Sequence, residues 1–155
     1  MEGAEKNMKK KITVLTLCAV LFALCSSAQA QQLAGKVPRI GYLSTGSGAG
    51  EARRVEALVQ GLRELGYAEG KNINIEYRFA EGNSERLPEL AKELVGLKVD
   101  VIVAPSTPAV QAAKQATTTV PIIFPGVADP VASGFVASLA RPGGNITGLI
   151  NYTPE

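Results

Sequence analysis

The sequence contains no histidine and no tryptophan, and its only two cysteines, Cys18 and Cys25, lie near the N-terminus. Without histidine, Ser-His-Asp hydrolysis, acid–base catalysis by imidazole and histidine-ligated zinc sites are excluded. Because no cysteine follows position 25, the rest of the chain holds no disulfide, thiol nucleophile or thiolate metal site. From this inventory we expect neither a cofactor nor a metal.

The first 30 residues have the organisation of a secretory signal peptide. Four lysines at positions 6–11 precede an uncharged apolar run at residues 12–24, and Ala30 ends a small-residue cleavage site. The apolar run is well short of the roughly 20 residues that span a bilayer. We therefore expect cleavage near Ala30, a flexible mature N-terminus at residues 31–36, and a periplasmic or secreted protein that is not an integral membrane protein once processed. An uncleaved anchor and a lipoprotein signal at Cys25 are the alternatives.

Most of the net positive charge belongs to this leader. The full chain has 16 basic and 14 acidic side chains, but residues 31–155 carry 12 of each. A nucleic-acid partner is not expected, because no cluster of Lys and Arg marks a basic face. Residues 31–155 are enough for one small domain.

Short apolar runs alternate with amphipathic segments from residue 37 onward. We expect strands at residues 39–44, 72–79, 99–104, 120–126 and 146–150, and helices at residues 51–67, 84–97 and 107–118, with a shorter helical segment at residues 131–140. Strands that alternate with helices in this way form right-handed βαβ units. The predicted fold class is α/β, an open parallel sheet of about five strands with helices on both faces.

Ligands of open parallel sheets bind at the carboxyl ends of the strands, where the strand order reverses. Two capping residues followed by proline lie at this edge, in Thr107-Pro108 and Asp129-Pro130. Helix capping alone explains both pairs. The functional interpretation is that both are helix starts whose free N–H groups attract an anion, with Ser106 adding a hydroxyl. If Asp129 accepts from a ligand amine, the edge suits an amino-acid-like zwitterion.

The glycine-rich loop at residues 45–50 is similar to a dinucleotide-binding loop. Its glycines follow a G-x-G-x-G pattern, but the dinucleotide fingerprint needs its third glycine where Glu51 stands. A small α/β nucleotide-binding or enzyme module is therefore the alternative function. Such an enzyme would have to rely on Asp129, Ser106 or Glu76 together with a cofactor.

Four segments carry a resemblance to a known family: RIGYLSTGS, GLRELGYAEGKNINIEYRFAEG, ERLPELAKELVGLKVDVIVAPSTPAVQAAKQAT and VPIIFPGVADPVASGFVASLARPGGNITGL. Together they resemble ABC-transporter substrate-binding proteins of the tryptophan/tyrosine transport group. The resemblance implies one lobe of a type I periplasmic-binding-protein-like fold with flavodoxin-like strand order. It also implies a non-catalytic exported protein that binds a small solute and serves an importer permease. The family's first-lobe pocket positions fall, residue by residue, on Ser44, Thr45, Gly46, Ser47, Ser106, Thr107 and Asp129.

The resemblance also implies a second lobe that this sequence does not contain. We expect the first lobe at residues 37–150 and the start of the crossover between lobes at residues 151–155. A binding protein whose two lobes close around the ligand gains affinity by burying most of it. A single lobe is therefore expected to bind weakly or not at all. A truncated fragment that folds and binds nothing is a further alternative.

Overall fold

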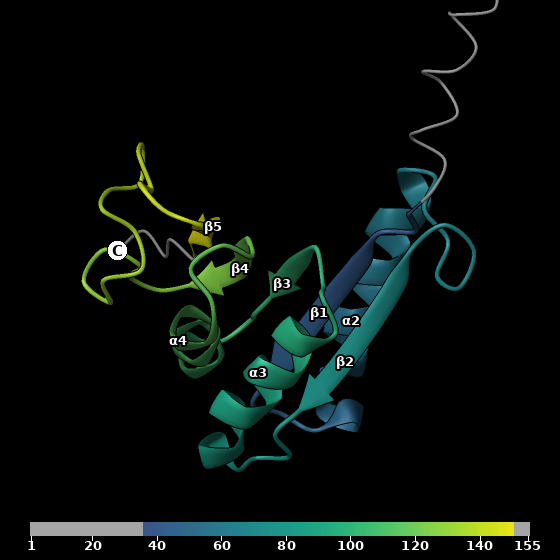
Figure 1. Cartoon of the computed structure of the whole chain (residues 1–155), viewed down its shortest axis with the longest axis horizontal. Coiled ribbons are helices and arrows are strands. Elements are labelled where there is room, and N and C mark those ends of the chain that lie inside the picture. The colour runs from purple at the N-terminus through teal and green to yellow at the C-terminus, as the bar shows by residue number, and fades with distance from the viewer. Residues whose placement is uncertain (1–35, 151–155) are drawn as a thin grey trace, which may run out of the picture. The chain divides into compact units, whose positions relative to one another are not determined.

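The computed structural model describes residues 36–150, which form a parallel sheet with helices on both faces. The expected leader and the crossover segment at residues 151–155 lie outside the described residues. Along the chain (Figure 1), the elements are β1 (Arg39–Ser44), α2 (Gly48–Glu64), β2 (Asn74–Phe79), the 3₁₀ turn η2 (Ser84–Arg86), α3 (Leu87–Gly96), β3 (Val101–Val103), α4 (Thr107–Ala116), β4 (Ile122–Val127) and β5 (Ile146–Ile150). The predicted α/β fold class is confirmed.

The five strands are parallel and lie in the order β2-β1-β3-β4-β5. This is the flavodoxin-like order, so the direction of the chain across the sheet reverses between β1 and β3. The register pairs Tyr42 with Val103 across these two strands. The residues that follow β1 and β3 therefore leave the sheet side by side.

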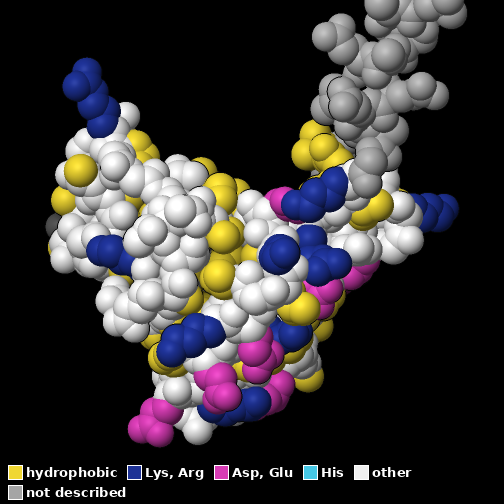
Figure 2. Space-filling model, in the orientation of Figure 1, with side chains coloured by type: hydrophobic (Ala, Val, Ile, Leu, Met, Phe, Trp, Pro, Cys, Tyr) yellow, Lys and Arg dark blue, Asp and Glu magenta, His cyan; other side chains and the backbone are white. Residues whose placement is uncertain are grey.

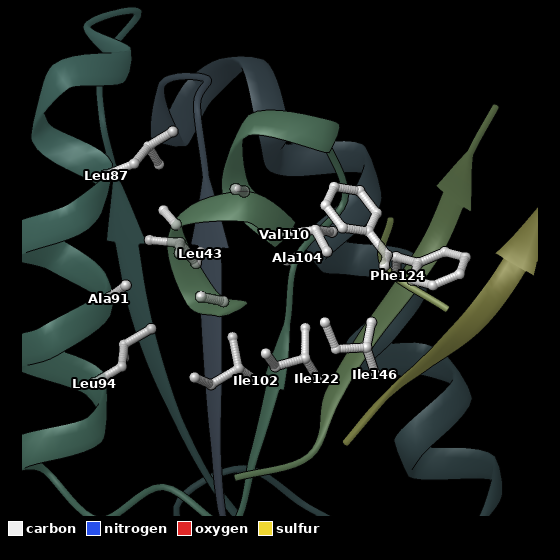
Figure 3. Packing of buried hydrophobic residues seen from close by; sticks show 14 of the residues in the cluster. Leu43, Leu87, Ala91, Leu94, Ile102, Ala104, Val110, Ile122, Phe124 and Ile146 are labelled. Carbon is white, nitrogen blue, oxygen red and sulfur yellow. The ribbon is translucent and has the colours of Figure 1, made fainter. Parts of the chain in front are cut away.

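Helices α3 and α4 cover one face of the sheet. Leu43, Ile102 and Ile122 point to this side and pack with Leu94 and Val110 from the two helices (Figure 3). All five side chains are fully buried. Close packing of aliphatic side chains from three strands and two helices makes this side the main hydrophobic core.

Helix α2 covers the opposite face, over the alternate residues of the strands. Ile40, Tyr42 and Val103 point to this side, and the apolar stripe of α2 is only partly buried against them. Beyond α2 no helix of the described chain covers β4 and β5 on this face, and Ile123 and Leu149 are exposed. Figure 2 shows hydrophobic side chains along the hollow between the β4–β5 part of the surface and the part formed by β1, β2 and α2.

The prediction of a short helix at residues 131–140 is wrong. The segment forms consecutive turns, in which the Ala132 N–H donates to Asp129 Oδ1 at 2.9 Å and the Phe135 N–H donates to the Pro130 carbonyl at 2.8 Å. Gly134 has a φ of +66°, which ends helical winding after one turn. The spacing of apolar residues there reflects the burial of Phe135 and Val136, not a helix.

The segment at residues 141–145 runs to the other edge of the sheet. The Asn145 side-chain amide donates to the carbonyl of Val120 at 2.8 Å, just before β4 begins. Because β5 starts next to that point, only the beginning of the segment at residues 129–145 lies at the carboxyl edge of the strands.

Several predicted element ends shift by a few residues. Helix α2 begins at Gly48, three residues earlier than expected, because Ser47 is its N-cap and accepts from the Gly50 N–H. Gly66, with a φ of +86°, follows the helix as a C-terminal glycine. Strand β3 is only three residues long. Within residues 36–150, no helix combines the length and the apolar character needed to cross a membrane.

Candidate functional site

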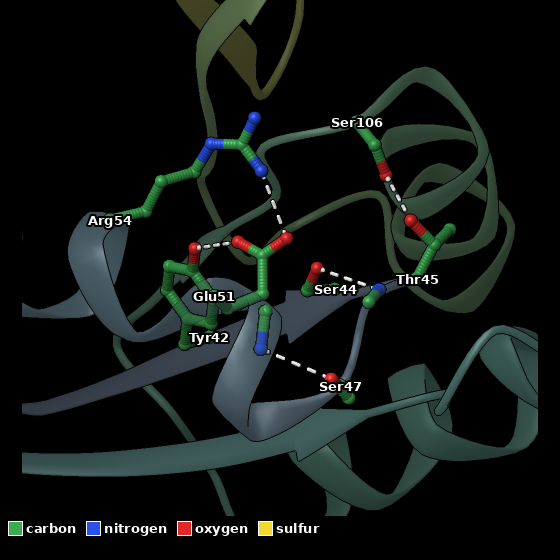
Figure 4. Close-up of polar contacts among 9 residues, drawn as sticks. Tyr42, Ser44, Thr45, Ser47, Glu51, Arg54 and Ser106 are labelled. Carbon is green, nitrogen blue, oxygen red and sulfur yellow. Dashed lines mark hydrogen bonds and ion pairs between the residues drawn. The ribbon is translucent and has the colours of Figure 1, made fainter.

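The loops after β1 and β3 meet at the carboxyl edge of the sheet. The hydroxyl oxygens of Thr45 and Ser106 lie 3.5 Å apart, within hydrogen-bonding distance, although 61 positions separate them in the sequence (Figure 4). Both residues are partly exposed. Of the residues predicted for the site, these two meet across different loops.

The β1–α2 loop is held by its own side chains. Ser44 Oγ accepts from the Gly46 N–H at 3.1 Å, and Ser47 Oγ accepts from the Gly50 N–H at 3.1 Å. Ser44 is buried at the end of β1, which leaves its hydroxyl out of reach of a solute. The Ser44 hydroxyl thus holds the loop from inside and the Ser47 hydroxyl caps α2, so the pocket role that the resemblance implies for these two residues stays a prediction.

The β2–η2 loop braces the same segment from the other side. The Glu81 and Gly82 N–H groups donate to the carbonyls of Gly46 and Thr45 at 3.2 and 2.8 Å. Glu81 also accepts from the Gly48 N–H at 3.4 Å. The bond to Glu81 and the Ser47 cap thus engage the N–H groups of Gly48 and Gly50 at the start of α2.

The start of α4 differs from that of α2. Ser106, not Thr107, is the N-cap residue, and its side chain makes no hydrogen bond to the backbone of α4. Thr107 is the first residue of the helix and is exposed. The Ser106 hydroxyl instead faces Thr45. An N-terminus without a side-chain cap keeps N–H groups and the positive end of the helix dipole available at this edge.

Asp129 follows β4, the next strand along the edge. It is exposed, and its Oδ1 caps the turn that follows by accepting from the Ala132 N–H. Among the described residues, no hydrogen bond joins Asp129 to Thr45 or Ser106 or engages its Oδ2. It does not start a helix as predicted, but it keeps an acceptor oxygen at the carboxyl end of β4.

A buried polar cluster lies beneath the β1–α2 loop (Figure 4). The Tyr42 hydroxyl donates to Glu51 Oε2 at 2.8 Å, and the Arg54 guanidinium donates to Glu51 Oε1 at 2.9 Å. The buried hydroxyl of Ser44 also helps to lower the pKa of this carboxylate. Glu51 is 5% exposed, so its charge is stabilised by these donors and by the first turn of α2.

These contacts shift the ionisation of both members of the central pair. Burial by itself raises the pKa of Glu51, but hydrogen bonds from Tyr42, Ser44 and Arg54 outweigh it and hold the pKa below its ordinary value. Burial, followed by the bond to Glu51, raises the pKa of Tyr42 far above its usual range. Tyr42 therefore stays a protonated donor and Glu51 an ionised acceptor at neutral pH.

The lowered pKa of Glu51 predicts a specific acid sensitivity. Because the folded pKa is depressed, the carboxylate contributes stability that is present above its ordinary pKa of 4.5 and is lost as the pH falls through the folded value. We expect Glu51→Gln to remove this part of the pH dependence, so that the stability difference from the parent chain shrinks on acidification. Urea unfolding over a pH series measures the difference, and parallel pH profiles would contradict it.

A cavity of about 480 Å³ opens on the α2 side of the sheet, just below the carboxyl edge. Its walls are mostly apolar, with Arg54 as the charged lining residue; they include Tyr42, Arg54, Leu58, Val103, Pro105 and Pro125. The hydroxyl of Tyr42 and one nitrogen of Arg54 are already bonded to Glu51. Within residues 36–150, no three His, Cys, Asp or Glu side chains gather closely enough to hold a metal ion.

Sequence reasoning missed the role of Glu51, although the sequence carries a signal for it. Glu51 occupies the apolar stripe of α2, four, seven and eight positions before Val55, Leu58 and Val59. A carboxylate on the buried face of an amphipathic helix needs a partner inside the protein. Tyr42 supplies that partner from the adjacent strand.

The strand order, the hydroxyl pair at its reversal point and the helix starts at the same edge define a class of fold, an open parallel α/β lobe whose loops converge at the edge where ligands of such sheets bind. The family follows from comparison with known proteins. Residues 41–154 match the family described as ABC transporter substrate binding protein, and the chain belongs to it.

Individual relatives agree with this family. A "Tyrosine-binding protein" of Clostridioides difficile is 40% identical over 97 residues, which are 63% of this chain and 28% of that protein. A solved ligand-free, open substrate-binding protein with adhesive properties from Clostridium difficile superposes with a TM-score of 0.70 at 32% identity, over 76% of this chain and 40% of its own. A Streptococcus protein solved in complex with L-Trp gives a TM-score of 0.69 at 30% identity, over 74% of this chain and 39% of its own. This chain thus spans well under half the length of each.

Proposed function

We propose that the chain is the first lobe, at residues 37–150, of an exported, non-catalytic solute-binding component of an ABC importer. Its solute is a small amino acid with an aromatic side chain. Family membership supports the transport role, and the leader-like residues 1–30 support export to the periplasm. The relatives described as binding tyrosine or solved with L-Trp support the choice of solute. A permease and a second lobe are the partners that this role requires.

In this proposal the carboxylate of the solute binds at the start of α4. The observation that carries it is the N-terminus of α4, where Ser106 leaves the backbone without a side-chain cap and faces Thr45 across the strand reversal. A helix N-terminus attracts a carboxylate through its N–H groups and its dipole. The hydroxyls of Thr45, Ser106 and Thr107 add further donors around the same point.

Asp129 is proposed to accept from the amine of the solute. Its Oδ1 is engaged by the Ala132 N–H, while Oδ2 keeps free lone pairs at the end of β4. Gly46 and Ser47 are proposed to contribute backbone groups to the site. The Ser47 hydroxyl accepts from the Gly50 N–H, and the Gly46 N–H donates to Ser44, so both residues are held within the β1–α2 loop.

A titration of the full chain with three related ligands tests this arrangement. We expect L-tryptophan to bind weakly and to shift the backbone amide resonances of Ser106, Thr107 and Ala109, because a single lobe buries little of the ligand. Indole-3-propionate keeps the carboxylate and is expected to shift the same amides, whereas tryptophanamide lacks it and is expected to leave them unchanged. Two-dimensional NMR measures these shifts, since it detects weak binding.

The variant Asp129→Asn separates the amine contact from the carboxylate contact. Asparagine still accepts from the Ala132 N–H, so the turn is preserved while the charge is removed. We expect weaker binding of L-tryptophan and unchanged binding of indole-3-propionate. Shifts confined to the opposite edge of the sheet, or equal responses to all three ligands, would exclude the proposed site.

A further inference from the structure

Glu51 is the only buried carboxylate in the described part of the chain. A buried charge is costly unless it is paired and hydrogen-bonded, and removal of one partner typically destabilises strongly. The bond to Tyr42 joins α2 to β1. The remaining contacts of Glu51 lead in another direction, toward the β1–α2 loop.

The carboxylate is in contact with the loop at two points. The Ser44 hydroxyl stabilises its charge, and the oxygen of that hydroxyl accepts from the Gly46 N–H at 3.1 Å. Since a hydroxyl has one proton and two lone pairs, Ser44 can accept from Gly46 while its proton is directed toward Glu51. A Cβ atom at Gly46 would lie 2.9 Å from Glu51 Oε1, so the Glu51 side chain leaves no room for a side chain at this position of the loop.

Thr45 lies between the two residues fixed in this way. Its carbonyl is held from outside by the Gly82 N–H at 2.8 Å. The position of its hydroxyl, 3.5 Å from Ser106, therefore depends on the inner brace that runs from Glu51 through Ser44 to Gly46. Arg54, which lines the cavity on the α2 side, bonds to the same carboxylate and completes the brace.

We propose that Glu51 is a positioning residue that fixes the β1–α2 loop, so that Thr45 faces Ser106 at the start of α4. The consequence for ligand affinity rests on the proposed function, while the consequence for the loop does not. Glu51 touches no ligand in this arrangement, and its effect is transmitted through Ser44 and Gly46.

The test compares Glu51→Gln with Glu56→Gln in the full chain. Both changes remove one negative charge from α2, but Glu56 is exposed and has no bond to the loop. The first measurement is hydrogen exchange of the Gly46 amide relative to amides of β3. We expect exchange of Gly46 to accelerate about tenfold in Glu51→Gln, the scale of a hydrogen bond to a charged group, and to stay at the parent rate in Glu56→Gln.

The second measurement is the affinity for L-tryptophan, which we expect to fall by about the same factor in Glu51→Gln only. An increase in exchange spread evenly over the sheet amides would mean a purely structural role and would overturn the proposal, as would unchanged exchange of Gly46. If the parent chain itself binds no L-tryptophan, the proposed function fails, while the exchange of Gly46 still decides the role of Glu51.

A second variant covers the case in which Glu51→Gln does not fold. Tyr42→Phe removes one donor to the carboxylate and keeps a ring in contact with Tyr77 and Phe79. A selective rise in Gly46 exchange is expected there too, at smaller amplitude. Its absence would count against the positioning role.

Discussion

Replacement of Gly148 by valine is expected to disrupt the pairing of β4 with β5. Gly148 lies opposite Phe124 in the register, and a Cβ atom there would overlap the Phe124 carbonyl oxygen and lie 2.6 Å from Cγ of its ring. A backbone carbonyl cannot rotate away as a side chain can, so the strands must separate or slip. We expect a loss of about 3 kcal/mol or more, at the upper end for overpacking. The midpoint of urea unfolding, followed by circular dichroism, measures it.

Gly61→Ala is the matched control for this prediction. Gly61 lies on α2 with no atom within 4 Å of its missing Cβ, so alanine fits there and raises helix propensity. We expect a gain of about 0.5–1 kcal/mol. Valine is otherwise favoured in strands, so a midpoint for Gly148→Val equal to that of the parent would show that Phe124 does not occupy this space.

Truncation of Leu94 to alanine is expected to cost about 2–5 kcal/mol, the range for large-to-small changes in a core. Leu94 is fully buried on α3, and its methyl groups lie 3.1 Å from the position that a Cβ at Gly41 would occupy. The helix therefore packs directly on the backbone of β1. Thermal and urea unfolding measure the loss, and Leu65→Ala, at a residue 75% exposed, is expected to change stability by less than about 0.5 kcal/mol.

A double variant makes this second prediction specific to the Gly41 contact. Gly41→Ala alone is expected to destabilise, because its methyl group would press on Leu94. In the presence of Leu94→Ala the same methyl group would fill part of the new cavity. We therefore expect the two effects to be non-additive, with Gly41→Ala less harmful or even stabilising in the double variant. Additive costs would contradict the packing of Leu94 on Gly41.

The strands and long helices could be predicted because their signals are periodic. The run Arg39–Ser44 and the run Ile146–Ile150 match the strands in the structure, and the alternation with helices is sufficient for a parallel sheet. The turn segment at residues 131–140 could not be separated from a helix by apolar spacing. The turns in this segment depend on the positive φ of Gly134 and on the burial of Phe135 in the core. The spacing of apolar residues predicts neither.

The edge of the sheet at which these loops meet could be predicted from the sequence, but the role of each loop residue could not. Topology alone brings the loops after β1 and β3 together, and the contact of Thr45 with Ser106 agrees with this. Which of two adjacent hydroxyl residues caps α4 is only weakly encoded, since serine is favoured over threonine at an N-cap by a modest margin and proline fits the first turn either way. The ligand contacts of Thr45, Ser106, Thr107 and Asp129 stay predictions.

The two faces of the sheet are covered unequally, and this affects how easily each part of the carboxyl edge can open. Helix α2 shares its side with no other helix of the described chain, and its apolar stripe is only partly buried. Detaching one thinly packed helix takes less free energy than unfolding the whole sheet. Ser47 and Gly48 begin this helix, so we expect the β1–α2 side of the carboxyl edge to open more easily than the side formed by α4, which packs in the main core. Local opening of α2 would therefore change one side of the carboxyl edge and leave the start of α4 in place.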